Sequence, residues 1–243
     1  MAEAAKDYRY LLDRGYPQKA ALNLVTSRYS LASEERSALM RCVHRTTDAV
    51  SIASKLISPT EVRGSSIVVD GYNTLLTILT ALEGGPLFLC DDCVVRDVRS
   101  SYTKGITTNS LAKSLEALAI ALSSLQPSHV LVILDKNVSH SAEHASIIRK
   151  VLLSRNINSS VELRQRADLG VLEHEAEAVS SSDYVILARA RRIFDLGGYA
   201  ASRIVGTKII TCFISGLGEE NLCGGPAGIW TRDHRLSTQE PRT

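Results

Sequence analysis

The sequence predicts an α/β protein in which a mostly parallel sheet is flanked by helices and preceded by a small all-α helical unit. Two patterns support this fold class. Residues 3–58 keep a helical apolar period, and short β-branched runs alternate with helical segments from residue 63 onward. The composition is that of a globular chain, since 44% of the 243 residues are hydrophobic. We expect a helical domain over residues 1–62, an α/β domain over 63–214 and a disordered tail over 215–243.

Helices are expected throughout the first domain. One begins near residue 3 and stops at Gly15, and a second follows Pro17, a residue suited to the start of a helix. Ser33 is the expected N-cap of a third helical stretch, which Pro59 ends.

The second domain changes to alternating strands and helices. Strands are expected over residues 65–70, 86–90, 129–135, 159–165 and 183–188, with a short strand at 94–95 and an edge strand over 203–214. Helices are expected over residues 73–85, 108–126, 141–156, 168–182 and 190–202.

Several classes of protein are excluded or lose support. The 28 basic and 26 acidic residues nearly cancel to a net charge of +2, so there is no polybasic nucleic-acid arm. Neither a signal peptide nor an apolar run of membrane-spanning length is present, and five scattered cysteines, including a lone Cys90–Cys93 pair, favour a reducing cytoplasm. The phosphate-loop, dinucleotide-binding and serine-hydrolase motifs are missing.

The tail over residues 215–243 has no hydrophobic period and is rich in Gly, Pro and Arg, which indicates a disordered terminus. A second interpretation concerns the gene. The codons GGG-ATT-TGG-ACC-CGG would encode Gly228 to Arg232, and their reverse complement resembles the T-arm of a transfer-RNA gene. In that case the reading frame continues into a neighbouring gene on the opposite strand, which the genomic DNA would reveal.

Aspartates follow the expected strands at the point where each strand ends. Asp70 is the last residue of the strand expected over 65–70, and Asp135 is the last residue of the strand expected over 129–135. Asp91 and Asp92 directly follow the strand expected over 86–90. Ligands of open α/β sheets bind at the carboxyl ends of the strands. Converging carboxylates repel one another unless a cation such as Mg²⁺ or Mn²⁺ lies between them. A divalent metal site is therefore expected there, and turn-forming or helix-capping aspartates are the alternative.

Other polar residues near these strand ends are candidates for binding a substrate phosphate. Most of them also have a purely structural interpretation. Asn73 and Ser141 are typical N-cap residues of helices, and Arg96 can form a local ion pair with Asp97. The basic run after residue 188 is typical of a solvent-exposed surface. The candidates are Asn73, Arg96, Ser139, Ser141, Arg189 and Arg191.

The segments IVVDGYNTLLTI, LFLCDDCVVRDVRSSY, VLVILDKNVSHSAEHA and SSDYVILARARRIFDL resemble, in this order, the PIN-like domain of an uncharacterised archaeal and bacterial family. The helical part of that family, known as domain of unknown function 434, is similar to LLDRGYPQKAALNLVTSRYSLASEERSAL. The resemblance covers residues 5–212. It implies a Rossmann-like fold and Mg²⁺- or Mn²⁺-dependent ribonuclease chemistry, with Asp70, Asp92, Asp135 and Asp183 as catalytic metal ligands and Asn73 beside the first.

Two departures from the pattern bear on activity. Cys93 stands where a glycine is expected, and the residues after Asp183 lack the second acidic residue common in PIN nucleases. Our leading hypothesis is a cytoplasmic metal-dependent nuclease acting on RNA rather than DNA. The alternative is a catalytically inactive PIN-like nucleic-acid-binding or adaptor protein. A small-molecule phosphatase lacks its DxDx motif, because Gly71 and Tyr72 follow Asp70. No membrane partner is expected, and the oligomeric state stays open, a homodimer included.

Overall fold

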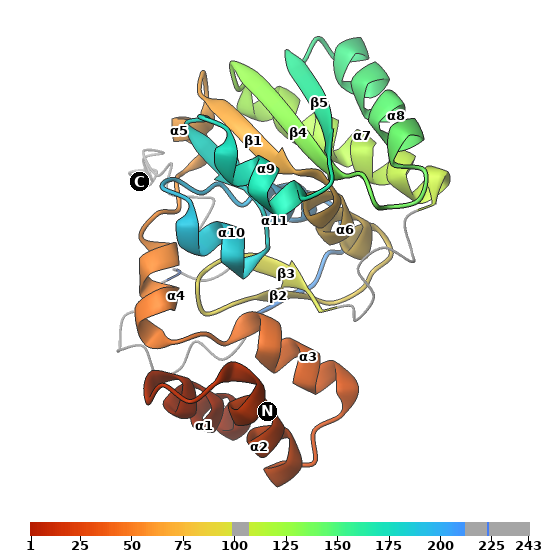
Figure 1. Ribbon diagram of the computed structural model, residues 1–243. Coiled ribbons are helices and arrows are strands. Elements are labelled where there is room, and N and C mark those ends of the chain that lie inside the picture. Colours follow the sequence, from red (N-terminus) through yellow and green to blue (C-terminus); the bar gives the residue numbers. More distant parts are fainter. Residues whose placement is uncertain (99–106, 212–222, 224–243) are drawn as a thin grey trace, which may run out of the picture.

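The computed structural model of the chain describes residues 1–98, 107–211 and 223 (Figure 1). The first part is helical and contains α1 (Ala2–Asp13), α2 (Gln18–Arg28), α3 (Ser33–Cys42), α4 (Thr46–Ala53) and α5 (Pro59–Val62). The helices of the α/β part are α6 (Gly71–Leu82), α7 (Thr108–Leu125), α8 (Ser141–Ser154), α9 (Ala167–Glu173), α10 (Tyr184–Arg189) and α11 (Leu196–Ala201). Its strands are β1 (Ser66–Asp70), β2 (Leu87–Leu89), β3 (Val95–Asp97), β4 (His129–Asp135), β5 (Ser159–Arg164), β6 (Ala178–Ser180) and β7 (Ile209–Thr211).

The main sheet is parallel and has the order β5-β4-β1-β6 among the described residues. β1 lies between β4 and β6, and its last residue, Asp70, is level with Ile133 of β4. Counted along the chain, the spatial order of these strands is 3-2-1-4. That order is the one found around the centre of a doubly wound sheet.

Alternate residues of β1 supply two cores on opposite faces of this sheet. Ile67 and Val69 pack with residues of α6, α7, α8 and α11, whereas Val68 packs with residues of α9 and α10. This follows from the two-residue period of a strand, and nearly continuous apolar runs are expected where both faces are covered. The expected α/β layering, with helices on both sides of a mostly parallel sheet, is thus confirmed (Figure 1).

A second, smaller sheet has the order β3-β2-β7 and lies between the main sheet and α3 (Figure 1). β2 is antiparallel to β3 and parallel to β7. The sequence predicts that the end of β2 lies at the same sheet edge as the ends of β1 and β4. That expectation is wrong, because β2 belongs to the other sheet, and Asp91 and Asp92 follow it there.

The helical part divides between two cores. Helices α1, α2 and α3 bury a core of their own that includes Tyr8, Leu12, Leu22 and Leu39. Ile52 of α4 instead packs with β1 and α10 in one of the α/β cores. The first 62 residues are helical as expected, and their last two helices are joined to the α/β part.

Two segments differ from the sequence-based expectations. The helix expected over residues 168–182 ends at Glu173, and residues Ala178–Ser180 form β6 instead. Residues 183–188, expected as a strand, belong to helix α10. Short apolar runs are ambiguous between strand and helix. Here Asp183 settles the local structure by capping α10, with its carboxylate accepting hydrogen bonds from Val185 and Ile186.

The expected serine N-caps are also corrected. Ala32, not Ser33, caps α3, and its N–H donates to Glu35 Oε2 at 2.9 Å. His140, not Ser141, caps α8 in a left-handed conformation. The Ser141 hydroxyl donates instead to the Lys136 carbonyl at 3.1 Å, so it stabilises the turn that follows β4.

Cys93 and Cys223 form a disulfide with their Cα atoms 5.3 Å apart, while Cys42 and Cys90 are buried thiols. The sequence favoured unpaired cysteines, and one pair departs from this because the structure brings residue 223 against the β2–β3 turn. The rest of the predicted tail over 215–243, and any read-through there, lies outside the described residues. No helix within the described ranges is long and apolar enough to cross a membrane.

Candidate functional site

The strand order places a topological switch point between the carboxyl ends of β1 and β6. The chain leaves β1 toward β4 and β5 and later returns to the other side of β1 as β6. The helices that follow β1 and β5 therefore cover opposite faces of the sheet. Such a switch point is where ligands bind in open α/β sheets. Asp70 ends β1 at this point, and residues 181–183 follow β6 there.

Asp70 is the most buried of the predicted metal-binding aspartates at the ends of the main sheet, with 6% of its surface exposed. Its Oδ2 atom accepts hydrogen bonds from Asn73 Nδ2 and from Ser181 Oγ, the latter at 2.8 Å. Both partners are neutral, and no basic residue of the described ranges forms an ion pair with it. The sheet thus holds a buried carboxylate without a cationic partner among the described residues.

The electrostatic surroundings of Asp70 favour its neutral form. Burial raises the pKa of Asp70 to about 6, and the nearby Asp183 carboxylate contributes to this increase, while the hydrogen bonds from Asn73 and Ser181 oppose it. A buried carboxylate beside a second carboxylate is stabilised by a bound cation, which reverses the local charge.

Asp183 is linked to Asp70 through one serine. Ser181 Oγ accepts a hydrogen bond from the Asp183 N–H at 3.0 Å while it donates to Asp70. One oxygen of Asp183, Oδ1, accepts from Val185 N at 2.7 Å and Ile186 N at 3.3 Å. Asp183 therefore caps α10 with one oxygen and lies close enough to Asp70 to affect its titration.

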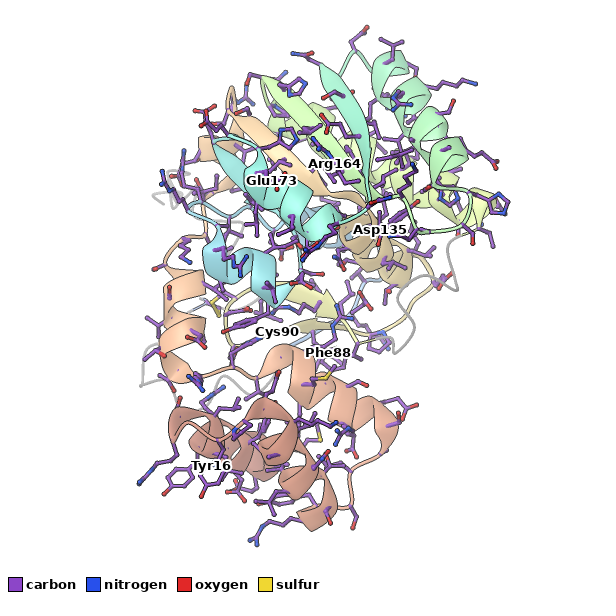
Figure 2. The ribbon with its side chains drawn as sticks, viewed as in Figure 1. Tyr16, Phe88, Cys90, Asp135, Arg164 and Glu173 are labelled. Atoms are coloured by element: carbon purple, nitrogen blue, oxygen red, sulfur yellow. A yellow bond between two sulfur atoms is a disulfide. The ribbon has the colours of Figure 1, made fainter. Side chains whose placement is uncertain are left out.

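Asp135 lies at the same end of the sheet, on the neighbouring strand. It pairs in register with Arg164 of β5, and Figure 2 shows the two residues near each other at the ends of their strands. Its Oδ1 accepts from the backbone and side-chain nitrogens of Asn137 at 2.8 and 2.9 Å. Burial, followed by the charge of Asp135, raises the pKa of Tyr72 to about 12, which places Asp135 close to the start of α6.

Asp92 has a different role from the one predicted. Its carboxylate forms a two-point ion pair with Arg96, at 2.7 Å to Nη1 and 2.6 Å to Nη2, and both side chains are buried. Burial alone would raise the pKa of Asp92, but Arg96 and His44 hold it below its usual value. The Arg96 guanidinium also donates to the Ser182 carbonyl at 2.8 Å. Arg96 is thus held by Asp92 and the Ser182 carbonyl, and its ion pair with Asp92 replaces the predicted substrate-binding role.

His44 and Asp91 complete this buried cluster. Asp91 accepts hydrogen bonds from the His44 N–H at 2.7 Å and contacts His44 Nδ1 at 2.6 Å. Arg9 of α1 donates to the same carboxylate at 3.2 Å. His44, Asp91 and Asp92 could hold a metal ion, because their potential ligand atoms all lie within 4.8 Å of one another. Because arginines already neutralise these carboxylates, we interpret the cluster as an ionic contact between α1 and the β2–β3 turn.

The predicted set of four aspartates is therefore not one compact centre. Asp70 and Asp183 adjoin, Asp135 lies at the end of the neighbouring strand, and Asp92 belongs to the buried ion pair. The sequence correctly placed Asp70 and Asp135 at the ends of β1 and β4. It missed Ser181, the residue that links two of these aspartates, because residues 168–182 were expected to be helical.

The other predicted substrate-binding residues are distributed unevenly. Asn73 contacts Asp70, and Ser139 is exposed in the turn after β4. Arg189 and Arg191 line a cavity of about 690 Å³ that also includes Glu177. The Glu177 carboxylate accepts from Ser66 N at the beginning of β1, so this cavity extends along the end of the sheet opposite Asp70. The two arginines are therefore not part of the Asp70 site.

The residues around Asp70 fit a small divalent cation. Asp70 and Asp183 supply carboxylate oxygens, which Mg²⁺ and Mn²⁺ prefer, and Mg²⁺ needs one or two protein carboxylates since it keeps several waters. The buried Ser182 Oγ has no hydrogen-bond partner within the described ranges. Ser182 directly precedes Asp183 and lines the same cavity as Asp183.

Comparison with known families accounts for both parts of the chain. Residues 59–199 match the family model described as domain of unknown function (DUF5616). The chain belongs to this family. Residues 1–55 match the model described as protein of unknown function (DUF434), which confirms the resemblance inferred for the helical part. The DUF5616 segment contains the Asp70 site and the Asp91–Asp92 turn, whereas the DUF434 segment contributes Arg9 and His44.

One relative is similar to this chain over most of its length. The uncharacterized protein MJ0935 of Methanocaldococcus jannaschii is 27% identical over 194 residues, which cover 80% of this chain and 93% of the relative. No solved structure is significantly similar to the chain.

Proposed function

We propose that this member of the DUF5616 family is a divalent-metal-dependent nuclease that hydrolyses phosphodiester bonds in RNA. One observation carries the proposal: the buried Asp70 carboxylate at the switch point of the sheet adjoins Asp183 and has only neutral hydrogen-bond partners within the described ranges. Two adjoining carboxylates of this kind favour a divalent cation. The proposal includes a cytoplasmic location, where RNA is available.

We further infer that the α/β part is a PIN-like domain. Its support is the resemblance of the sequence segments together with the order β5-β4-β1-β6, which is the Rossmann-like order around β1. Asp70, Asp183 and Asp135 lie at one end of the sheet. They are three of the four acidic residues that the resemblance implies as metal ligands.

Asp70 and Asp183 would hold the Mg²⁺ or Mn²⁺ ion, and Asp135 would contribute from the neighbouring strand. Such an ion, when bound, polarises a phosphoryl oxygen and lowers the pKa of a water molecule. The protein's own contribution is positional. Asn73 and Ser181 fix the Asp70 carboxylate, and the cap of α10 fixes Asp183.

The proposal is tested by cleavage of labelled single-stranded and structured RNA in the presence of Mn²⁺. We expect Asp70→Asn and Asp183→Asn to reduce the rate by about 100-fold or more, since metal ions contribute several kcal/mol to such reactions. Asp168→Asn is the matched control, because Asp168 is an exposed acid in the first turn of α9. Equal cleavage by the wild type and Asp70→Asn would mean that the activity does not come from this site.

A non-catalytic nucleic-acid-binding protein is the second candidate. It is favoured because two of the predicted metal ligands already form hydrogen bonds within the protein. Asp183 caps α10, and Asp135 accepts hydrogen bonds from Asn137. This candidate requires RNA binding that weakens with salt, no cleavage and no Asp70-dependent Mn²⁺ binding. Titration with Mn²⁺ separates the two candidates, because tight binding lost in Asp70→Asn supports only the nuclease.

A further inference from the structure

Two cavities adjoin where the helical part meets α10. The first, of about 240 Å³, is lined by Leu12, Tyr16, Gln18, Val43, His44, Arg45, Asp48 and Tyr184. The second, of about 230 Å³, shares Gln18, His44 and Tyr184 with the first and continues past Arg41 to Ser182 and Asp183. A continuous path therefore leads from the α1–α2 turn to one of the proposed metal ligands.

Exposed aromatic rings line this path. Tyr16 is 51% exposed in the turn between α1 and α2, and Figure 2 shows it at the margin of the helical part. Tyr184, at the start of α10, is 37% exposed. Tyrosine rings offer planar faces on which bases stack.

The geometry around Tyr184 holds its ring in a fixed position. Its ring is stacked on His44 with centroids 4.9 Å apart and planes 11° from parallel, and its hydroxyl donates to Asp48 Oδ2 at 2.7 Å. His44 is in turn fixed by Asp91, as described above. A rigid ring loses little conformational entropy on binding, so the side chain is prepared to accept a planar ligand.

The polar groups of the cavities suit a nucleotide. Gln18 and Asp48 offer donors and acceptors for the edge of a base, and the exposed Arg45 lies near enough to the Tyr184 hydroxyl to lower its pKa, although burial and Asp48 raise it overall. Residues 1–62 contain nine basic and seven acidic side chains, so the helical part has a net charge of +2. The cavities are smaller than the roughly 300–1,000 Å³ of drug-sized ligand sites and suit single bases.

We propose that Tyr16 and Tyr184 form a base-stacking site through which the helical part binds single-stranded nucleic acid and directs it toward Asp183. The inference rests on the proposed nuclease function for its choice of ligand. It extends that function by giving the helical part a defined role, since Tyr16 comes from the DUF434 segment and Tyr184 from the DUF5616 segment. A duplex, whose bases are stacked internally, would not bind in this way.

Fluorescence anisotropy of labelled single-stranded oligoribonucleotides in EDTA tests the site without relying on a metal ion. We expect Tyr16→Ala and Tyr184→Leu to weaken binding by about five-fold or more each, because base stacking on an aromatic ring contributes substantially to affinity. Tyr16→Phe retains the ring and should bind like the wild type. Tyr10→Ala is the matched control, since Tyr10 is 57% exposed on α1 and lines neither cavity.

The outcomes separate this inference from the proposed function. Equal affinity of wild type and both tyrosine variants, equal affinity for duplex and single strand, or no binding at all would overturn the stacking site. Cleavage measured with Mn²⁺ is an independent result. Loss of cleavage in Asp70→Asn with unchanged binding by Tyr16→Ala would support the nuclease and reject the stacking site.

Discussion

Asp70 illustrates how one residue connects stability to the proposed chemistry. Burial raises the pKa of Asp70 in the folded, metal-free protein from its usual value of 3.8 to about 6. When folding raises the pKa of a carboxyl group, the contribution of that group to stability is complete below the pKa that it has in the unfolded state. This contribution is lost as the pH rises through the pKa that the group has in the folded state. The Asp70 site therefore destabilises the metal-free protein at neutral pH.

We expect the free energy of unfolding of Asp70→Asn to rise relative to that of the wild type by up to about 3 kcal/mol between pH 4 and pH 7. The reason is that folding raises the pKa of Asp70 by about two pH units. Urea unfolding in EDTA at several pH values measures this difference. Adding Mn²⁺ at pH 7 should stabilise the wild type and leave Asp70→Asn unchanged. A stability difference that does not vary with pH would contradict the assigned cause.

Arg96 tests the interpretation of the buried cluster. Removing the guanidinium leaves Asp92 as a buried charge whose remaining ion-pair partner within the described ranges is His44. We expect Arg96→Met to lower the free energy of unfolding by about 3–5 kcal/mol. Arg155→Met is the matched control, since Arg155 pairs with Glu116 at the surface and its loss should cost no more than about 1 kcal/mol. Similar costs for both variants would show that Arg96 is not the essential partner of Asp92.

At the residue level, the sequence identified Asp70 and Asp135 because each directly follows a continuous apolar run that is typical of a buried strand. It could not assign Asp92, whose partners depend on the tertiary structure. His44 lies 48 residues away along the chain from Asp92, and Arg96 turns inward from the next strand. The positions of the strand-end acids were therefore predictable, whereas their neutralisation by buried cations was not.

At the level of elements, the segment after β6 limits what sequence reasoning could recover. Residues 178–188 contain a short apolar run on each side of three serines and an aspartate, and nothing local distinguishes strand from helix. Pairing with β1 makes the first run a strand, and the Asp183 cap makes the second a helix. The longer elements, such as α7 and β4, have strong periods and were predicted correctly.

The junction of β1 and α6 gives a prediction for an element boundary. A Cβ atom on Gly71 would lie 2.5 Å from Leu134 Cδ2 and 2.8 Å from Val132 Cγ1, so α6 must approach β4 at a glycine. We expect Gly71→Ala to destabilise the protein by about 1–3 kcal/mol and to displace Asp70. Gly197→Ala should cost less, since its nearest contact is Thr77 Cβ at 3.2 Å. Thermal unfolding of both variants compares the costs, and a smaller cost at Gly71 would contradict the packing.

At the level of the whole molecule, a buried ionic contact joins the helical part to the small sheet. Arg9 comes from α1, His44 from the α3–α4 connection, and Asp91 from the β2–β3 turn. Figure 2 labels Cys90, the residue next to Asp91, between the helical part and the α/β part. Because the three-helix core around Tyr8 is separate from the α/β cores, this contact is a principal link between the two parts.

We expect Arg9→Met to loosen residues 1–43 more than the rest of the chain, because Asp91 then loses its only arginine partner within the described ranges. Hydrogen exchange followed by mass spectrometry should show faster exchange in α1 to α3 and little change in α7 and α8. Lys6→Met, which removes an exposed ion pair with Glu3, is the control and should leave exchange unaltered. Uniform loosening of the whole chain would contradict a local link.

The central claim is that Asp70 and Asp183 bind a divalent cation at the switch point of the main sheet. A crystal structure of the protein soaked in Mn²⁺, with anomalous diffraction measured for wild type and Asp70→Asn, tests it most directly. We expect an anomalous peak beside Asp70 and Asp183 in the wild type and its loss in the variant. No peak at that position, or a peak confined to the His44, Asp91 and Asp92 cluster, would contradict the claim.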